Sequence, residues 1–573
     1  MYWCHQASSL SQGQEEDVLR LAESLTNAKQ YHRAAHMLKT SQLQTKSWKG
    51  CFLTVNALFL AKNVEEAAKI LETTETLVEK SVIDKAKSEK SPNCEWLVAL
   101  LVLKGKVLEA LDNRTQASEF FSEALKVDPY CQEALHALTK HQMLSADKEQ
   151  KLIEAIVFDN DDDQELLKFI YTIGLKKYNK PQDLIVPKPL EHTMKNNLCL
   201  QVALAERHFY NCDYLACHQI SVAVMKKDPF HDIALPIHIS CLVELKKSND
   251  LFLLAHRLVE LYPEWAVAWF AVGSYYFLIG KQETARRYLS RATQLDRVFG
   301  PAWLAYGHSF ALENEHDQAI AAYFKAYQLM PGCHLPLLYI GVEYGLTNNV
   351  KLAEKFFSES LQIAPEDPFV LHELGMTCFQ NGDFETAEKH MLKALKQVQS
   401  VKQSTFSSQW ESLLNNLGHT ARKLGKLEKA LDYHQQALVL KPMTSSTYSA
   451  IGFVQSLMKN YFDAVESFHR ALSLKRDDAF STTMLNNVVE HLKDEIVPFE
   501  GKLILFTILV IKVIFKIILS FVEFPEEVPK LPEITLNLDT SSKIEESEDT
   551  LKSGMETSVE MDNSTDIEMA IDS

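Results

Sequence analysis

The stretch WLAYGHSFALENEHDQAIAAYFKAYQLMP, residues 303–331, decides the fold of this chain. Four residues after its first tryptophan comes Gly307, and Ala319 follows twelve residues later. A second alanine lies seven residues after Ala319, and Pro331 ends the stretch. Small residues at these intervals let two helices pack closely, and proline ends the second helix because it has no N–H to continue it. The stretch therefore predicts a pair of antiparallel helices.

The same spacing recurs along the second half of the chain, with a period of 34 residues and one longer interval of 43. A large residue, a glycine, two alanines and a proline at this period are the pattern of the tetratricopeptide repeat (TPR). We predict that the glycines and the first alanines lie where helices approach most closely. These positions are Gly273, Ala285, Gly307, Ala319, Gly341, Ala353, Gly375, Ala387, Gly418, Ala430, Gly452 and Ala464.

The repeats predict an all-α fold, a TPR helical-repeat solenoid (superhelix) with a disordered acidic C-terminal tail. Weaker copies of the pattern lie upstream, and residues 145–197 fit it worst. The predicted organisation is N-terminal TPR-like repeats at 15–144, a helix and connector at 145–197, degenerate repeats at 198–264, a C-terminal TPR array at 265–490, a hydrophobic segment at 502–524 and the tail at 525–573.

Charge and cysteine content narrow the class of protein. The chain of 573 residues carries a net charge of −17, which argues against a nucleic-acid partner because phosphates need a basic surface. Its ten cysteines include no CxxC pair, which favours reduced thiols in the cytosol or nucleus. Residues 525–573 are rich in Ser, Thr, Glu and Asp, a composition that predicts disorder and phosphorylation.

The sequence predicts no catalytic residue, no cofactor and no metal site. It contains no Gly-rich phosphate loop, no HExxH and no GxSxG motif. The best metal candidate combines His208, Cys212, Cys217 and His218, but we interpret these residues as repeat core and solvated histidine. Ser309, His316 and Asp317 all surround one repeat turn, and nothing marks an oxyanion site beside them.

A peptide-binding groove is the more plausible functional surface, because the first helices of TPR pairs line a concave face. Inward-facing positions are expected three residues before, and one and four residues after, each repeat glycine. Apolar walls with a few amides and cations suit an extended or helical peptide. The predicted groove residues are Leu338, Val342, His372, Met376, Phe379, Asn415, His419, Arg422, Ser449 and Phe453.

Longer strings go beyond a generic repeat. They are ARRYLSRATQLDRVFGPAWLAYGHSFALENEHDQAIAAYF, GCHLPLLYIGVEYGLTNN, LAEKFFSESLQIAPEDPFVLHELG and the pair LLNNLGH and ALDYHQQALVL. Over roughly residues 15–490 the chain closely resembles the subunit-six family of the anaphase-promoting complex, also called the cell-division-cycle protein sixteen family.

The resemblance implies a non-catalytic scaffold subunit of a ubiquitin ligase that marks mitotic substrates for degradation. It implies other subunits of that complex as partners, including a small subunit held in the C-terminal groove, and a homodimer formed through the N-terminal repeats. It also implies a location in the nucleus and cytoplasm, with the centrosome and spindle as further sites. The segment MYWCHQASSL departs from the N-terminal stretch usual in the family.

Residues 503–522, LILFTILVIKVIFKIILSFV, leave an alternative open. Sixteen of these 20 residues are apolar, which is about the length that crosses a bilayer, but Lys512 and Lys516 oppose insertion. A membrane span, a helix packed against protein and a non-native segment all remain alternatives, and the span is not favoured. A membrane span would favour a tail-anchored TPR co-chaperone or adaptor, although Val342 and Met376 do not fit a carboxylate clamp.

Overall fold

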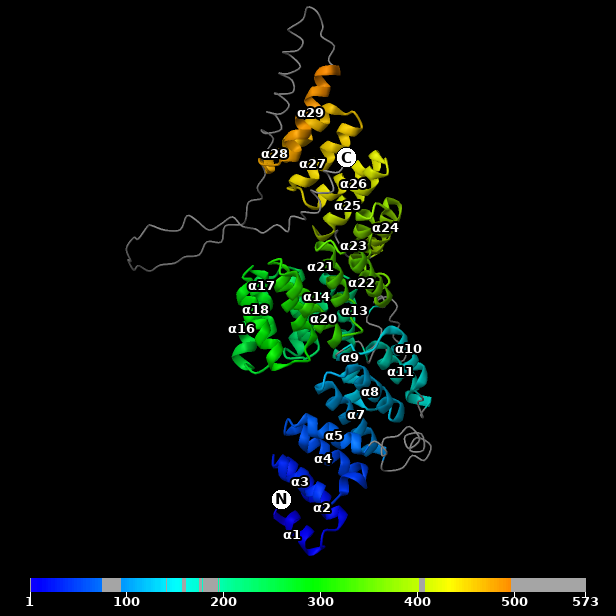
Figure 1. Cartoon of the computed structure of the whole chain (residues 1–573), viewed down its shortest axis with the longest axis vertical. Helices are drawn as coiled ribbons and strands as arrows, with labels where there is room; N and C mark the ends of the chain where they lie inside the picture. The colour runs from blue at the N-terminus through cyan, green and yellow to red at the C-terminus, as the bar shows by residue number, and fades with distance from the viewer. Residues whose placement is uncertain are drawn as a thin grey trace, which may run out of the picture. The chain divides into compact units, whose positions relative to one another are not determined.

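The structure is a computed structural model that describes residues 2–74, 94–140, 142–156, 161–174, 178, 194, 196–400 and 408–495. Within these residues it contains 27 α-helices and no strand. Helices of similar length follow one another in antiparallel pairs along the chain (Figure 1). The observed architecture is thus the all-α TPR solenoid that the repeats predict.

The first array contains ten of these helices. They are α1 (Tyr2–Leu10), α2 (Glu15–Asn27), α3 (Tyr31–Thr40), α4 (Trp48–Leu60), α5 (Val64–Thr73), α7 (Cys94–Ala110), α8 (Arg114–Val127), α9 (Gln132–Lys140), α10 (Ala146–Ala155) and α11 (Asp161–Gly174).

The second array contains the other seventeen. They are α13 (Leu198–Tyr210), α14 (Tyr214–Lys227), α15 (Ala234–Glu244), α16 (Ser248–Leu261), α17 (Ala266–Leu278), α18 (Gln282–Leu295), α19 (Gly300–Ala311), α20 (His316–Leu329), α21 (Leu335–Leu346), α22 (Val350–Ile363), α23 (Pro368–Gln380), α24 (Phe384–Ser400), α25 (Glu411–Lys423), α26 (Leu427–Leu440), α27 (Ser445–Leu457), α28 (Tyr461–Leu474) and α29 (Ala479–Glu495).

A left-handed residue marks the turn inside each pair of the second array from α17 onward. It lies seven residues after the repeat glycine, and its φ angle ranges from 59° to 85°. Glycine and asparagine tolerate this conformation best, and it ends a helix by turning the chain back on itself. The residues are Gly280, Asn314, Asn348, Gly382, Gly425 and Lys459. The turn chemistry therefore repeats with the same period as the packing positions.

The repeat glycines lie against the large side chain of the second helix in their own pair. A methyl group added to Gly341 would come within 2.5 Å of the Phe357 ring, and one added to Gly375 within 2.7 Å of Met391. The first alanine of each of the six repeats is fully buried. Small residues at these positions thus allow the two helices of a pair to approach closely.

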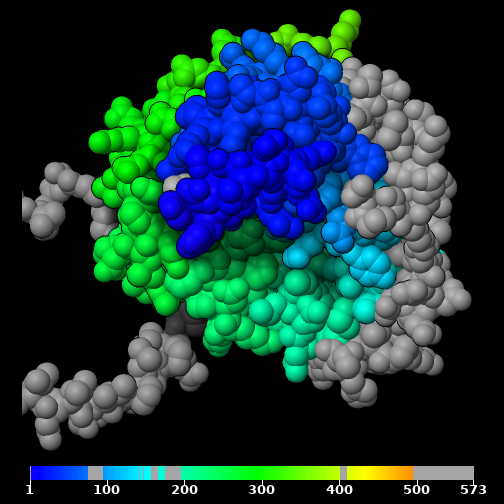
Figure 2. All heavy atoms as spheres, turned by 90° about the horizontal axis from the view of Figure 1, so that it is seen from below, coloured from blue at the N-terminus to red at the C-terminus, as the bar shows by residue number. Residues whose placement is uncertain are grey.

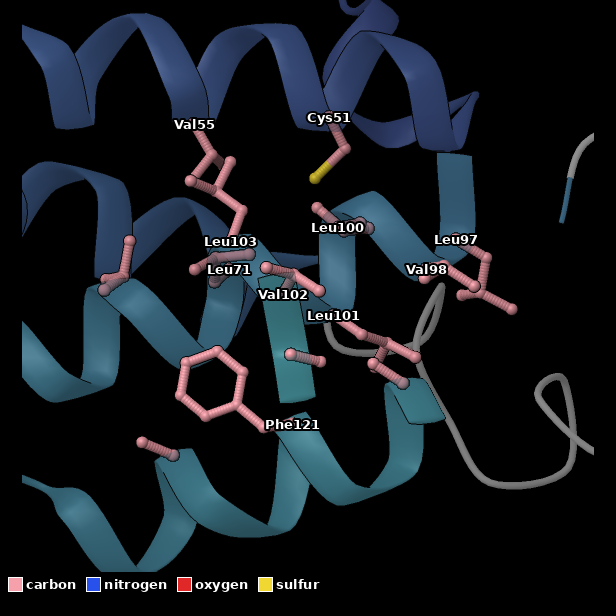
Figure 3. Close-up of a cluster of buried hydrophobic side chains, with 14 of the residues drawn as sticks. Cys51, Val55, Leu71, Leu97, Val98, Leu100, Leu101, Val102, Leu103 and Phe121 are labelled. Atoms are coloured by element: carbon pink, nitrogen blue, oxygen red, sulfur yellow. The ribbon is translucent and has the colours of Figure 1, made fainter. Parts of the chain in front are cut away.

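The first array has its own hydrophobic core, which is drawn in Figure 3. Side chains of α4, α5 and α7 meet there, and Val55, Leu100 and Leu101 are fully buried. Phe121 of α8, the helix that pairs with α7, belongs to the same cluster. The first array is therefore a packed repeat domain, although its sequence matches the repeat pattern only weakly.

Residues 145–197 differ from our prediction of one helix and a connector. The structure places two helices there, α10 and α11. Tyr171 of α11 is buried, and its hydroxyl donates a hydrogen bond to the Pro129 carbonyl at 2.8 Å. Helix α11 begins within the acidic part of this interval, at Asp161.

The predicted hydrophobic segment at 502–524 and the predicted tail at 525–573 lie outside the described residues. Among the helices that the structure does describe, none is both long and apolar enough to span a bilayer.

Contacts between distant repeats join the two arrays. The Arg114 guanidinium donates a hydrogen bond to the Leu329 carbonyl at 2.7 Å, across 215 residues of sequence. The Gly332 N–H donates to the Gln142 carbonyl at 2.8 Å. We call these four residues the closure contact. A solenoid joined only through neighbouring repeats would lack it, so here the end of α20 and the start of α21 are tied to the first array.

Candidate peptide-binding groove

The predicted groove residues lie on the first helices of four consecutive pairs, α21, α23, α25 and α27. They divide by exposure into two groups. Leu338, His372, Phe379, Asn415 and Ser449 are buried. Val342, Met376, His419, Arg422 and Phe453 are half-buried and retain surface for a partner.

Asn415 is used inside the array. Its amide Nδ2 donates to Thr447 Oγ1 of α27 at 2.9 Å and also to Glu411, one turn earlier on α25. Its Oδ1 lies 3.0 Å from His434 Nδ1. A buried amide with this many partners fixes the spacing between neighbouring helices. Asn415 therefore positions α27 against α25.

His434 occupies the core position where the equivalent pairs carry leucine, tyrosine, phenylalanine or methionine. It lies against Gly418, and a methyl group added to Gly418 would come within 2.5 Å of the His434 ring. Burial lowers the pKa of His434 well below its usual value, so the ring is neutral and its Nδ1–H donates to Asn415. His434 thus extends the hydrogen-bond network of Asn415 from α25 to α26.

His419 and Arg422 lie beside this network on the half-buried side of α25. The His419 ring packs edge-on against His434 at 4.9 Å between centroids. Burial, with a smaller effect from Arg422, lowers the pKa of His419 to about 4, so it is neutral at pH 7. The Arg422 guanidinium lies 4.8 Å from the centroid of the Phe453 ring. These three residues combine one fixed positive charge with aromatic surface.

The other buried groove residues also have partners within the array. His372 Nε2 accepts from Asn416 Nδ2 at 3.0 Å. Ser449 donates to Asp478, the residue before α29, at 3.1 Å. Leu338 lies in an apolar cluster with Phe357, and the Phe379 ring contacts that of Phe384. The buried half of the predicted set is thus engaged within the array, and the half-buried half keeps exposed surface.

A second polar cluster escaped the sequence analysis. Asp367 lies 3.1 Å from His334 Nε2 and accepts a hydrogen bond from Cys212 Sγ at 3.8 Å. Burial raises the pKa of Cys212, so it is a thiol and no nucleophile. Cys212 is 155 residues from Asp367 in sequence, and no periodic pattern links them.

The dismissed metal candidate is dispersed in the structure. His208 pairs with Asp213 at 3.2 Å, while Cys217 is buried beside Cys241. In the described part of the chain, no three His, Cys, Asp or Glu side chains come close enough together to hold a metal ion.

Glu244, the last residue of α15, should make stability depend on pH. Burial raises its pKa from 4.5 to about 7, and Lys246 only partly opposes this. The folded protein therefore holds this proton more tightly than the unfolded chain. The contribution of this group to the free energy of unfolding is fully present below about pH 4.5 and is lost as pH rises through about 7. Glu244→Gln should gain about 2 kcal/mol relative to the wild type between pH 5 and pH 8.

Hydrogen exchange at the α15 amides of both proteins, at pH 5 and pH 8, measures this gain. The exposed Glu260 of α16, replaced by glutamine, is the matched control and should show the wild-type protection at both pH values. An equal difference between the Glu244→Gln variant and the wild type at the two pH values would refute the raised pKa.

Comparisons with known proteins agree with this geometry. The tetratricopeptide repeat family matches residues 98–131 and 368–442. The chain is 50% identical over 504 residues to the cell division cycle protein 16 homolog of Homo sapiens, covering 86% of this chain and 81% of that protein. It is 36% identical over 491 residues to anaphase-promoting complex subunit 6 of Arabidopsis thaliana, covering 82% and 89% of the two chains.

A solved structure is similar as well. The crystal structure of the APC/C hetero-tetramer of Cut9 and Hcn1 contains a chain that superposes with a TM-score of 0.71 at 28% identity. The match covers 85% of this chain and 92% of that one, so both arrays and the groove helices belong to a shared architecture.

Proposed function

This chain belongs to the family of anaphase-promoting complex subunit 6, or cell division cycle protein 16, and from that membership we propose that it is a non-catalytic scaffold of the ubiquitin ligase. Its role is to hold other subunits in place while cell-cycle-dependent ubiquitination of mitotic substrates occurs elsewhere in the complex. The observation that carries the proposal is the identity of 50% over 504 residues, which spans both arrays.

The C-terminal groove is proposed to hold a segment of a small partner subunit. The support is twofold. The similar chain Cut9 was crystallised in a hetero-tetramer with Hcn1. In the present chain the groove keeps half-buried apolar and aromatic surface at Val342, Met376 and Phe453. A groove of this kind suits an extended or helical peptide.

A homodimer through the N-terminal repeats is part of the proposal. Helix α1 has no buried residue, and it exposes Tyr2, Trp3 and Leu10. Figure 2 shows the face on which the N-terminal helices lie, in blue. Large exposed apolar side chains favour burial against a partner surface.

We propose a location in the nucleus and cytoplasm, with the centrosome and spindle as further sites, where such a ligase meets mitotic substrates.

Native purification followed by depletion tests the function. The chain should co-purify with subunits of the ligase and with a small subunit, and light scattering of the same material should report two copies per assembly. Complete depletion should stabilise mitotic cyclins and arrest cells before anaphase, because the scaffold no longer holds the ligase together. Normal cyclin turnover after complete depletion, in cells without a second copy of the gene, would refute the scaffold role.

A further inference from the structure

Arg422 differs from the other enclosed arginines of the described chain in lacking an acceptor. Arg207 donates to the Thr172 carbonyl at 2.8 Å, and Arg286 pairs with Glu315 at 3.0 Å. Arg422 is half-buried, its Nε is enclosed without a hydrogen-bond partner, and no carboxylate forms an ion pair with it in the residues that the structure describes.

The surroundings of Arg422 hold its guanidinium in place. Its central carbon lies over the Phe453 ring, 4.8 Å from the centroid, and that ring contacts Phe480 edge-on at 5.7 Å between centroids. His419, one turn earlier on α25, is neutral at pH 7 and does not repel it strongly. A guanidinium stacked on an aromatic ring keeps its donor edge free for a planar acceptor. The cost of removing such a cation from water is offset only when a negative group arrives.

We propose that Arg422 is the anion subsite of the groove and binds a carboxylate side chain, Asp or Glu, in the segment of the small partner subunit. This inference rests on the proposed function, which supplies the segment. A carboxylate matches the guanidinium with two parallel hydrogen bonds. An apolar neighbour in the same segment would cover the Phe453 and Phe480 rings.

The test uses the full chain and the recombinant small subunit that co-purifies with it, with binding measured by calorimetry. Arg422→Gln should weaken binding about 30-fold, because the acidic residue of the segment is left buried without its partner. Arg422→Lys keeps the positive charge but cannot make two parallel hydrogen bonds. Its affinity should lie between those of the wild type and the Arg422→Gln variant. Arg291→Gln is the matched control: Arg291 also stacks on an aromatic ring, Trp269 at 3.8 Å, but lies outside the groove on α18.

Stability of the free chain separates a binding role from a structural one. Because Arg422 has no protein acceptor, Arg422→Leu should leave the melting temperature of the free chain unchanged or raise it. A structural arginine would lower it. In the partner, each acidic residue is replaced in turn by its amide. One of these replacements should weaken binding to the wild-type chain but not to the Arg422→Gln variant.

Three results would overturn the subsite. One is Arg422→Gln binding within twofold of the wild type. Another is a lowered melting temperature of the free Arg422→Leu chain. A third is Arg422-dependent binding that appears only after the segment is phosphorylated. In each case the wild-type chain still binds the small subunit, so the proposed function stands. Failure of the wild-type chain to bind the small subunit removes both the proposed function and the subsite.

Discussion

Replacing Arg114 by alanine should destabilise the repeats around α8 and α20 by about 3 to 5 kcal/mol. Arg114 is 5% exposed, and its Nη2 lies 3.3 Å from Glu109 Oε1 while its Nη1 donates to the Leu329 carbonyl. Truncation to alanine removes the positive charge that pairs with the buried Glu109 carboxylate. It also removes the donor that the Leu329 carbonyl uses. Both losses add to the cost.

A neutral replacement of the pair should recover most of this loss. Burial raises the pKa of Glu109 and lowers that of Arg114, so on both residues desolvation outweighs the attraction between them. Breaking such a pair is costly, but replacing both residues by uncharged ones of similar size often leaves the stability unchanged. The double variant Arg114→Met, Glu109→Gln should therefore lie within about 1.5 kcal/mol of the wild type.

Hydrogen exchange of the native protein, read at the amides of α8 and α20, measures the effect locally. Local readout is needed because a long repeat array does not unfold as a single two-state unit. Arg470→Ala is the control, since its pair with Glu466 is exposed and spans one helical turn, and the expected loss is about 0.5 kcal/mol. A loss below about 1 kcal/mol in the Arg114→Ala variant would contradict a structural role for the buried pair.

Replacing Gly332 by alanine should cost about 3 kcal/mol at the same junction. The added methyl would lie 2.7 Å from the Gln142 carbonyl oxygen and closer still to that of Leu144. Both atoms belong to backbone, so neither can rotate away as a flexible side chain would. Relief requires the segment around Gln142 to move, and this movement breaks the hydrogen bond from the Gly332 N–H.

Gly345 is the matched control for this substitution. It lies in the last turn of α21, and an added methyl there would meet no atom within 4 Å. Alanine at Gly345 should be neutral or should stabilise the helix by up to about 1 kcal/mol, because alanine restricts the unfolded chain. Hydrogen exchange at α21 compares the two variants. Equal protection in both would show that the space beside Gly332 is not restricted.

The parts of the fold that follow the 34-residue period were open to prediction from sequence. Each repeat glycine lies against a residue of its own pair, and each turn residue acts on its own helix end, so the signal is local. The closure contact is different. Arg114 and Leu329 are 215 residues apart, and nothing in the periodic pattern marks either of them. One of the two helices α10 and α11 was missed for a related reason, because both pack without the repeat signature.

The groove shows the same division. Counting from the repeat glycines selects Val342, His419 and Arg422, and the structure leaves all three half-buried. The count does not reveal what each side chain bonds to. Asn415 has the residue type of a peptide contact, yet its amide is bonded to Thr447 and Glu411 within the array. Only the three-dimensional neighbours distinguish a residue that shapes the groove from one that is free to bind in it.

The closure contact also constrains how the protein is made. A ribosome adds about 5 to 20 residues per second, so the α20 end that Arg114 contacts emerges about 10 to 40 s after α8. During that interval the first array folds against its own neighbours, and the Arg114 and Glu109 side chains are hydrated. Truncated chains that stop before residue 325 therefore keep this surface exposed to chaperones and proteases. Docking of the α20 end against α8 is the step that covers it.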